Sequence, residues 1–285
     1  MGAQLEQSTR TFSEQLEQHW RQGKFVCVGL DSEYERLPNI VKQTSSIEEA
    51  IFNFNRAIID ATHDLVCAYK PNAAFYEAQG EAGHLALVRT VLHIKANYPQ
   101  IPVILDAKRA DIGNTNAGYV QSAFDVLGVD AITVHPYLGR EALAPFLARQ
   151  DKGIIVLAKT SNPGSGEFQD LPVGETGEPL YQIVARHVAR HWNTNGNCAL
   201  VVGAPYPGEI QRVRSIVGDI PFLIPGIGAQ GGEVEATVKA ARDSRGWGMI
   251  INSSRNIIFA SQGDDFAQAA RAATIQLHEQ ISSVG

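Results

Sequence analysis

The chain has 285 residues, of which 44% are hydrophobic and 19% charged, so it holds enough apolar material for a large core and is neither disordered nor fibrous. Lys and Arg total 24 against 30 Asp and Glu, and the net charge of -6 argues against a protein that coats nucleic acid or an anionic membrane. No apolar run approaches the ~20 residues of a membrane span, and residues 1–12 lack the apolar core of a signal peptide. We therefore expect a cytoplasmic protein. Cys27, Cys67 and Cys198 lie far apart inside apolar runs, which indicates reduced, buried thiols rather than a disulfide framework or a zinc cluster.

The chain begins with a helical pattern over residues 9–21, within an extension of residues 1–23 that we expect to close the base of the fold. After it, short apolar runs rich in β-branched residues alternate with segments of helical periodicity. The eight candidate strands cover residues 25–30, 65–69, 102–105, 131–134, 153–158, 199–202, 222–224 and 248–251. The helical segments include residues 46–63, 83–97, 114–127, 179–192, 232–242 and 264–282.

Strands that are apolar along their whole length belong in a parallel sheet covered by helices. Eight strand–helix units without a Pro/Gly/Ser-rich linker favour a closed barrel over a doubly wound open sheet. We therefore predict an α/β protein in which residues 1–285 form a single (β/α)8 TIM-barrel domain with an extra N-terminal helix. Residues 162–178 form the one long stretch without periodicity, and a loop of that length is typical of an active-site lid or a disordered segment.

Polar residues follow most of the predicted strands. Because the active site of a parallel barrel forms where its strands end, these residues are the candidates for function. In chain order they are Asp31, Lys70, Asp106 with Lys108, His135, Lys159 with Thr160 and Ser161, and Asn252 to Arg255.

The densest charged cluster is the sequence D-A-K-R-A-D-I at residues 106–112. In an extended chain residues two apart point the same way, so Asp106 and Lys108 should leave the strand side by side, with Asp111 at the turn into the next helix. Lys70, on a neighbouring strand, can add a second ammonium group, and opposite charges keep one another ionised. Such an array would destabilise an anionic substrate group pressed against Asp106, and would stabilise and protonate a carbanion beside Lys108. A purely structural ion-pair network fits the same residues.

The sequence P-G-I-G-A-Q-G-G at residues 225–232 follows the seventh strand and opens a helix. Glycines let the backbone approach an oxyanion, and a helix N-terminus supplies free N–H groups. With N-S-S-R at residues 252–255 after the eighth strand, this is the usual position of a phosphate site in a TIM barrel, and Arg255 would bind the phosphate through two hydrogen bonds. The glycine segment alone also fits a tight connection between a strand and a helix.

These motifs, with G-L-D at residues 29–31 upstream, resemble those of the orotidine 5′-phosphate decarboxylase family, and K-P-N-A-A-F-Y at residues 70–76 resembles its longer bacterial form. The likeness runs from about Phe25 to Ile258. It implies a TIM-barrel homodimer with sites shared across the interface. It also implies a lyase that converts orotidine 5′-monophosphate to UMP and CO2 in pyrimidine synthesis, without metal or organic cofactor.

The resemblance implies a role for each matching residue. Lys70, Asp106 and Lys108 match the family's charged array, with Lys108 donating the proton to C6 after CO2 leaves, and Asp111 matches the member that reaches into the neighbouring subunit's site. The substrate-binding matches are Asp31 for a ribose hydroxyl, Thr115 for a ribose contact across the dimer, Ser161 for the pyrimidine amide, and Gly228, Gln230 and Arg255 for the phosphate. Ser254 departs from the pattern, because many relatives have glycine there.

Two alternatives share parts of these motifs. A Mg²⁺-dependent sugar-phosphate lyase or decarboxylase of the same superfamily has the D-x-K-x-x-D pattern but carries glutamate in place of Lys70. A charged lysine cannot ligate Mg²⁺, which needs oxygen ligands, so Lys70 argues against this alternative. The other is a nucleotide-binding protein that keeps the phosphate site without the chemistry.

Overall fold

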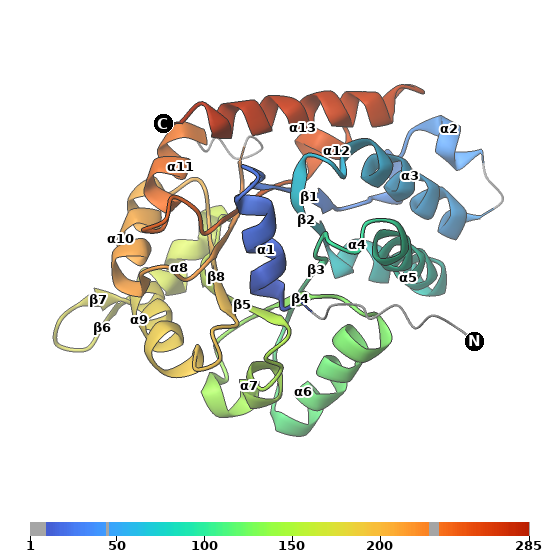
Figure 1. The fold of residues 1–285 in the computed structure, drawn as a ribbon. Helices are drawn as coiled ribbons and strands as arrows, with labels where there is room; N and C mark the ends of the chain where they lie inside the picture. Colours follow the sequence, from blue (N-terminus) through green and yellow to red (C-terminus); the bar gives the residue numbers. More distant parts are fainter. Residues whose placement is uncertain (1–9, 44–45, 228–233, 285) are drawn as a thin grey trace, which may run out of the picture.

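The computed structural model describes residues 10–43, 46–227 and 234–284. Eight parallel strands lie in the order β2-β1-β10-β9-β8-β5-β4-β3, and single bridges from Tyr69 to Val103 and from Asn72 to Asp106 join β2 to β3. The predicted TIM barrel is confirmed, and Figure 1 shows helices surrounding the strands. The strands are β1 (Val26–Leu30), β2 (Val66–Pro71), β3 (Ile104–Arg109), β4 (Ala131–Val134), β5 (Gly153–Lys159), β8 (Cys198–Val202), β9 (Phe222–Pro225) and β10 (Met249–Ser253).

The helices of the outer layer follow the strands along the chain. Two segments predicted as single helices change geometry part-way: α6 (Gly113–Val120) and α9 (Leu180–His187) continue into the π-helical turns η2 (Gln121–Val126) and η4 (Val188–Trp192). The predicted start of the helix over 232–242 lies outside the described residues. The remaining elements are η1 (Tyr34–Arg36), α2 (Asn39–Lys42), α3 (Ile47–Thr62), α4 (Ala73–Glu77), α5 (Gly80–Asn97), α7 (Gly139–Leu147), α10 (Pro207–Val217), α11 (Val234–Ala241), α12 (Arg255–Ile258) and α13 (Phe266–Ser282).

Helix α1 (Phe12–Trp20) crosses one end of the barrel (Figure 1). It begins at Thr11 because the side chain of that residue accepts a hydrogen bond from the backbone of Glu14, whose carboxylate accepts one from the backbone of Thr11 in return. Leu16 and Trp20 pack against inward-facing strand residues such as Ile104, so apolar side chains fill this end. The extra N-terminal helix therefore forms the base of the barrel, as we expected.

Between the strands and the outer helices lies the larger part of the hydrophobic core, and the strands contribute to both layers. All residues of β1, β2, β4 and β8 are buried, which is why these strands are apolar along most of their length. The three cysteines are buried and free, as predicted, and burial raises the pKa of Cys27 to about 12.

The stretch without periodicity contains regular elements too short to give a pattern. They are the 3-10 turn η3 (Pro163–Ser165), the single-turn helix α8 (Gly166–Gln169) and a hairpin of β6 (Pro172–Val173) with β7 (Glu178–Pro179). The insertion therefore contains short regular elements, and its assignment as an active-site lid stays a prediction.

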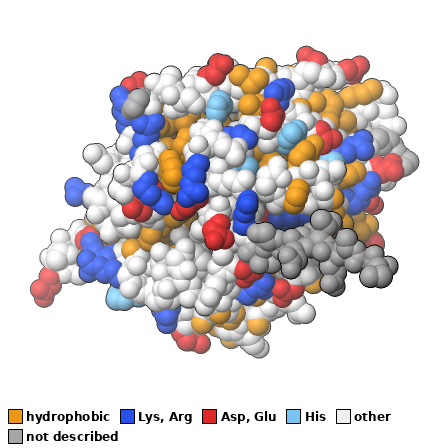
Figure 2. Space-filling model, in the orientation of Figure 1, with side chains coloured by type: hydrophobic (Ala, Val, Ile, Leu, Met, Phe, Trp, Pro, Cys, Tyr) orange, Lys and Arg blue, Asp and Glu red, His pale blue; other side chains and the backbone are white. Residues whose placement is uncertain are grey.

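Acidic and basic side chains are interspersed over the face of the molecule that carries α1 (Figure 2). Within the part of the chain that the structure describes, no helix combines the length and the apolar character needed to cross a membrane.

Candidate active site

A cavity of about 300 Å³ opens at the end of the barrel opposite α1, where the strands end. Its floor and walls are the apolar residues Leu157, Val201, Leu223 and Pro225. Its polar lining comes from the ends of β2, β3, β4 and β5: Lys70, Asp106, Lys108, Thr133, Thr160, Ser161 and Asn162. The strand ends therefore bring four predicted site residues, Lys70, Asp106, Lys108 and Ser161, to one cavity.

Asp106 lies between the two lysines. The Lys70 ammonium donates to Asp106 Oδ2 at 3.0 Å, and the Lys108 ammonium donates to Asp106 Oδ1 at 2.7 Å. Burial alone would raise the pKa of Asp106, but the two ammonium groups outweigh it and hold the pKa well below its usual range. Burial alone would lower the pKa of Lys70, but Asp106 and Asp31 outweigh it and raise the pKa. Lys70 and Asp106 are therefore both charged at neutral pH.

The lysines differ in exposure. The Lys70 side chain is 4% exposed, whereas that of Lys108 is 49% exposed and reaches the open part of the cavity. A buried ammonium needs charged partners, and Lys70 has two, since Asp31 Oδ1 lies 3.9 Å from its Nζ atom. Both lysines line the cavity, and Lys108 is the more accessible of the two.

The backbone at Lys108 differs from our expectation. Its φ of 47° is the left-handed conformation, and among the described residues no other non-glycine residue has a positive φ. The pairing of β3 with β4 shifts register between Leu105 and Arg109, so the extended geometry that we assumed for this segment is wrong at Lys108. The side chains of Asp106 and Lys108 still meet, but they do so through the left-handed backbone at Lys108 and not through the two-residue period of a strand.

Thr133, on β4, fixes this conformation and is a site residue that the sequence analysis missed. Its hydroxyl donates to Asp106 Oδ1 at 2.9 Å and accepts the backbone N–H of Lys108 at 2.9 Å. One side chain thus holds both the carboxylate and the strained peptide. A threonine inside the apolar run A-I-T-V was the only available signal.

Asp31 follows β1 and lies next to Lys70, which lines the cavity. Its Oδ1 atom is buried and has no hydrogen-bond partner among the described residues, although the Lys70 ammonium lies 3.9 Å away. A buried carboxylate oxygen without a partner is costly, so this atom is prepared to accept a hydrogen bond from a ligand.

Ser161 follows β5, and two contacts fix the chain around it. Gly203, at the end of β8, packs against it so closely that a Cβ on Gly203 would lie 2.8 Å from Ser161 Cα. The Gln169 side chain accepts the Thr160 N–H at 2.9 Å and donates to the Thr160 hydroxyl at 2.8 Å. In addition, Lys159 donates to Asp170 at 2.6 Å. The insertion is thus attached to the end of β5 beside Ser161.

Asp111 and Thr115 lie outside the cavity of their own chain. The Asp111 carboxylate accepts the backbone N–H of Ile112 at 2.6 Å, and within the described ranges it forms no ion pair. Thr115 is exposed on α6. Neither residue reaches the Lys70–Asp106–Lys108 array within this protomer.

Of the predicted phosphate residues, only Arg255 lies among the described residues; Gly228 and Gln230 lie outside them. Arg255 is exposed at the start of α12 and lines an open hollow together with Arg36. Ser254, which departs from the family pattern, is accommodated by Gly29, because a Cβ there would lie 1.9 Å from the Ser254 hydroxyl oxygen.

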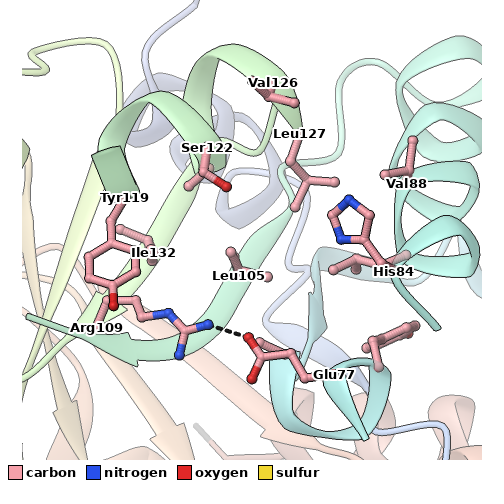
Figure 3. A pocket seen from close by; sticks show the side chains of 14 residues that line it. Glu77, His84, Val88, Leu105, Arg109, Tyr119, Ser122, Val126, Leu127 and Ile132 are labelled. Carbon is pink, nitrogen blue, oxygen red and sulfur yellow. Dashed lines mark hydrogen bonds and ion pairs between the residues drawn. The ribbon is translucent and has the colours of Figure 1, made fainter. Parts of the chain in front are cut away.

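A second cavity, of about 170 Å³, lies outside the barrel between α4, α5, α6 and η2 (Figure 3). Arg109 points into it and forms an ion pair with Glu77, although its chain neighbour Lys108 lines the inner cavity. Its lining is otherwise mostly apolar and includes no member of the array. We therefore assign the candidate active site to the cavity at the barrel mouth.

Among the described residues, no three or more His, Cys, Asp or Glu side chains are grouped closely enough to hold a metal ion. Asp106, which lines the cavity, and Asp31 both face the Lys70 ammonium.

Comparison with known proteins identifies the family. A model described as the orotidine 5′-phosphate decarboxylase / HUMPS family matches residues 24–273. The chain belongs to this family. It is 51% identical over 273 residues to the orotidine 5′-phosphate decarboxylase of Cellvibrio japonicus (strain Ueda107) and 50% identical to that of Azoarcus sp. (strain BH72), covering 95% of this chain and 98% of each relative.

Solved structures of similar fold also come from this family. The Leishmania donovani OMP decarboxylase matches with a TM-score of 0.81 and 38% identity, covering 96% of this chain and 98% of that chain. The Leishmania donovani UMP synthase matches with a TM-score of 0.84 and 39% identity, covering 96% of this chain and 56% of that one. The resemblance drawn from the motifs is therefore confirmed.

Proposed function

We propose that the protein is an orotidine 5′-phosphate decarboxylase, a lyase that converts orotidine 5′-monophosphate to UMP and CO2 in pyrimidine synthesis. The observation that carries the proposal is the charged array of Lys70, Asp106 and Lys108 in a cavity at the barrel mouth. Relatives that bear this name are about half identical over nearly the whole chain. Three buried free thiols agree with a reducing compartment such as the cytoplasm.

The array suits a reaction that develops charge on carbon. Decarboxylation breaks the bond between C6 and the carboxyl carbon and leaves the electron pair on C6, a ring carbon without a neighbouring electron sink. Asp106, ionised in the free protein, repels the substrate carboxylate, and the fixed ammonium of Lys108 stabilises the carbanion. Lys108 then transfers a proton to C6, and the neutral amine regains a proton from solvent.

The remaining site residues bind the rest of the nucleotide. Asp31, with its unpartnered oxygen, accepts a hydrogen bond from a ribose hydroxyl. Ser161 contacts the pyrimidine amide from the end of β5, next to the insertion over 162–178, which we propose covers this side of the site. Gly228, Gln230 and Arg255 bind the phosphate. Although the phosphate is distant from C6, these contacts would lower the activation barrier of decarboxylation by holding the substrate carboxylate against Asp106.

We further propose a homodimer in which Asp111 and Thr115 complete the partner's site. Neither lines the cavity of its own chain, and both lie on the segment that follows β3. The apolar side chains of Ile112, after β3, and of Tyr137 and Leu138, after β4, are exposed, and burial against a second copy would remove them from water.

The direct test is the loss of orotidine 5′-monophosphate absorbance with purified protein treated with a chelator. We expect full turnover without added metal. Activity that is abolished by the chelator and restored by Mg²⁺ would instead support the metal-dependent sugar-phosphate alternative. Tight UMP binding without turnover would support the nucleotide-binding alternative.

A further inference from the structure

A buried network of polar side chains lies directly behind Asp31. It comprises Ser32 after β1, Asn55 of α3, Tyr76 of α4 and Thr90 of α5, and each is at most 1% exposed. One member lies in the loop after β1 and one on each of the helices α3, α4 and α5.

Asn55 is the centre of the network. Its Oδ1 atom accepts from the Ser32 hydroxyl at 2.5 Å, and its Nδ2 group donates to the hydroxyls of Tyr76 and Thr90, each at 3.0 Å. Thr90 donates onward to the backbone carbonyl of Ala86 at 2.7 Å. Every member has a partner, and a fully satisfied buried network is rigid.

Tyr76 connects this network to β1, because its hydroxyl donates to the backbone carbonyl of Leu30 at 3.0 Å. Burial raises the pKa of Tyr76, so the hydroxyl keeps the proton that it donates. Leu30 and Ser32 are the two chain neighbours of Asp31. The network therefore fixes the backbone on both sides of the carboxylate.

The fixed backbone matters because Asp31 has a competing partner. Its Oδ1 atom lies 3.9 Å from the Lys70 ammonium, beyond hydrogen-bond distance, and has no partner of its own among the described residues. A small relaxation of residues 30–32 would let this oxygen close on Lys70. The ammonium would then compete directly for this oxygen and weaken the hydrogen bond that it can accept from a ligand.

We propose that Asn55 and Tyr76 are positioning residues that keep the Asp31 carboxylate away from Lys70 and available to a sugar hydroxyl of the bound nucleotide. This inference rests on the proposed function, since it assigns Asp31 to the ribose. Neither residue touches substrate; each acts through the backbone around Asp31.

The test compares two buried tyrosines that each lose one hydroxyl. Tyr76→Phe removes the hydroxyl that donates to Leu30. Tyr69→Phe is the matched control, because Tyr69 is equally buried and its hydroxyl donates to the Ile59 carbonyl and contacts Thr62, away from residues 30–32. The probes are UMP, 2′-deoxy-UMP and 3′-deoxy-UMP, measured by calorimetry, so the result does not depend on turnover.

In the unaltered protein we expect UMP to bind about 10- to 100-fold more tightly than the analogue that lacks the hydroxyl contacted by Asp31, as for a hydrogen bond to a charged group. In Tyr76→Phe this ratio should fall to within about threefold, mainly through weaker UMP binding, while binding of that analogue is unchanged. Tyr69→Phe should keep the full ratio, even if it loses as much thermal stability as Tyr76→Phe.

A Tyr76→Phe protein that binds UMP and the analogue with equally reduced affinity, or that keeps the full ratio, would overturn the inference. Should Tyr76→Phe fail to fold, Ser32→Ala removes the hydroxyl that donates to Asn55 and carries the same expectation. Failure of the unaltered protein to bind UMP would refute the proposed function itself. UMP binding without preference over either analogue would leave the decarboxylase proposal standing and refute both the ribose role of Asp31 and this inference.

Discussion

The two ends of the barrel are built from the same strands but from opposite kinds of side chain. On β3, Ile104 packs toward α1 at the base, and Asp106, two residues later, pairs with two lysines at the mouth. The base is closed by apolar contacts, whereas the mouth contains charges that are partly buried and paired. Stability and chemistry are therefore separated along the barrel axis. A substitution at the base should leave catalytic activity unchanged, and one at the mouth should leave folding stability unchanged.

Lys108→Ala, at the mouth, should have the largest effect on activity. Loss of the proton donor should lower the decarboxylation rate by about 10²- to 10⁴-fold, the range of general acid catalysis. Because the Lys108 side chain is 49% exposed, the thermal midpoint should change little, and UMP binding should persist. Orotidine 5′-monophosphate absorbance and thermal unfolding measure the two properties. Turnover close to that of the unaltered protein would remove Lys108 from its role.

A second test at the mouth asks whether one active site contains residues from both subunits of a dimer. Lys108→Ala and Asp111→Ala should each be inactive alone, but mixed subunits should recover about a quarter of the normal activity, because half the dimers would be mixed and each would contain one intact site. Subunit exchange is checked independently with differently tagged chains. Exchange without recovery would contradict the shared site.

Leu16→Ala, at the base, is the converse experiment. Leu16 is fully buried between α1 and the strands, so removal of its side chain should lower the free energy of unfolding by about 2–5 kcal/mol. The turnover of the folded enzyme at 25 °C should stay within about twofold, because no contact of Leu16 reaches the mouth. Denaturant unfolding and initial rates distinguish the two properties. A large loss of turnover by fully folded protein would show that the ends are coupled.

The strands were predictable because burial on both faces leaves an unmistakable apolar run. The largest difference is at the end of β3: residues 106–109, three of them charged, continue the strand, and we ended it at Leu105. The helices α7 and α10 were not among the helical segments that we named, and α7 contains Pro145, which weakens a helical pattern.

The site was predictable where a motif is continuous in sequence, as in Asp106 and Lys108. It was not predictable where a contact joins distant elements. The left-handed backbone of Lys108 depends on Thr133, and the support of Asp31 depends on Asn55 and Tyr76. No local pattern encodes such contacts, because single polar residues inside apolar runs look alike whether or not they meet in the fold.

The smallest effect is expected from an ion pair that belongs to neither end. Arg271 of α13 donates to both carboxylate oxygens of Asp64, at 2.6 and 2.8 Å, and this hydrogen bonding lowers the pKa of Asp64 to about 2. The geometry is as good as that around Asp106, but the side chains are 40% and 46% exposed, so solvent screens the pair.

Arg271→Gln should return the pKa of Asp64 to about 4, the ordinary value, as measured by NMR titration of the carboxyl carbon. The pKa of Asp64 is lower in the folded protein than its ordinary value of about 4 in the unfolded chain. The ion pair therefore stabilises the fold above about pH 4, and this stabilisation is lost as the pH falls toward 2. The variant should therefore lose at most about 1 kcal/mol at pH 7 and show a weaker loss of stability on acidification. Activity should not change. An Asp64 pKa that stays near 2 in the variant would mean that Arg271 does not set this pKa. A loss of several kcal/mol would mean that burial does not explain why ion pairs at the mouth contribute more than this exposed one.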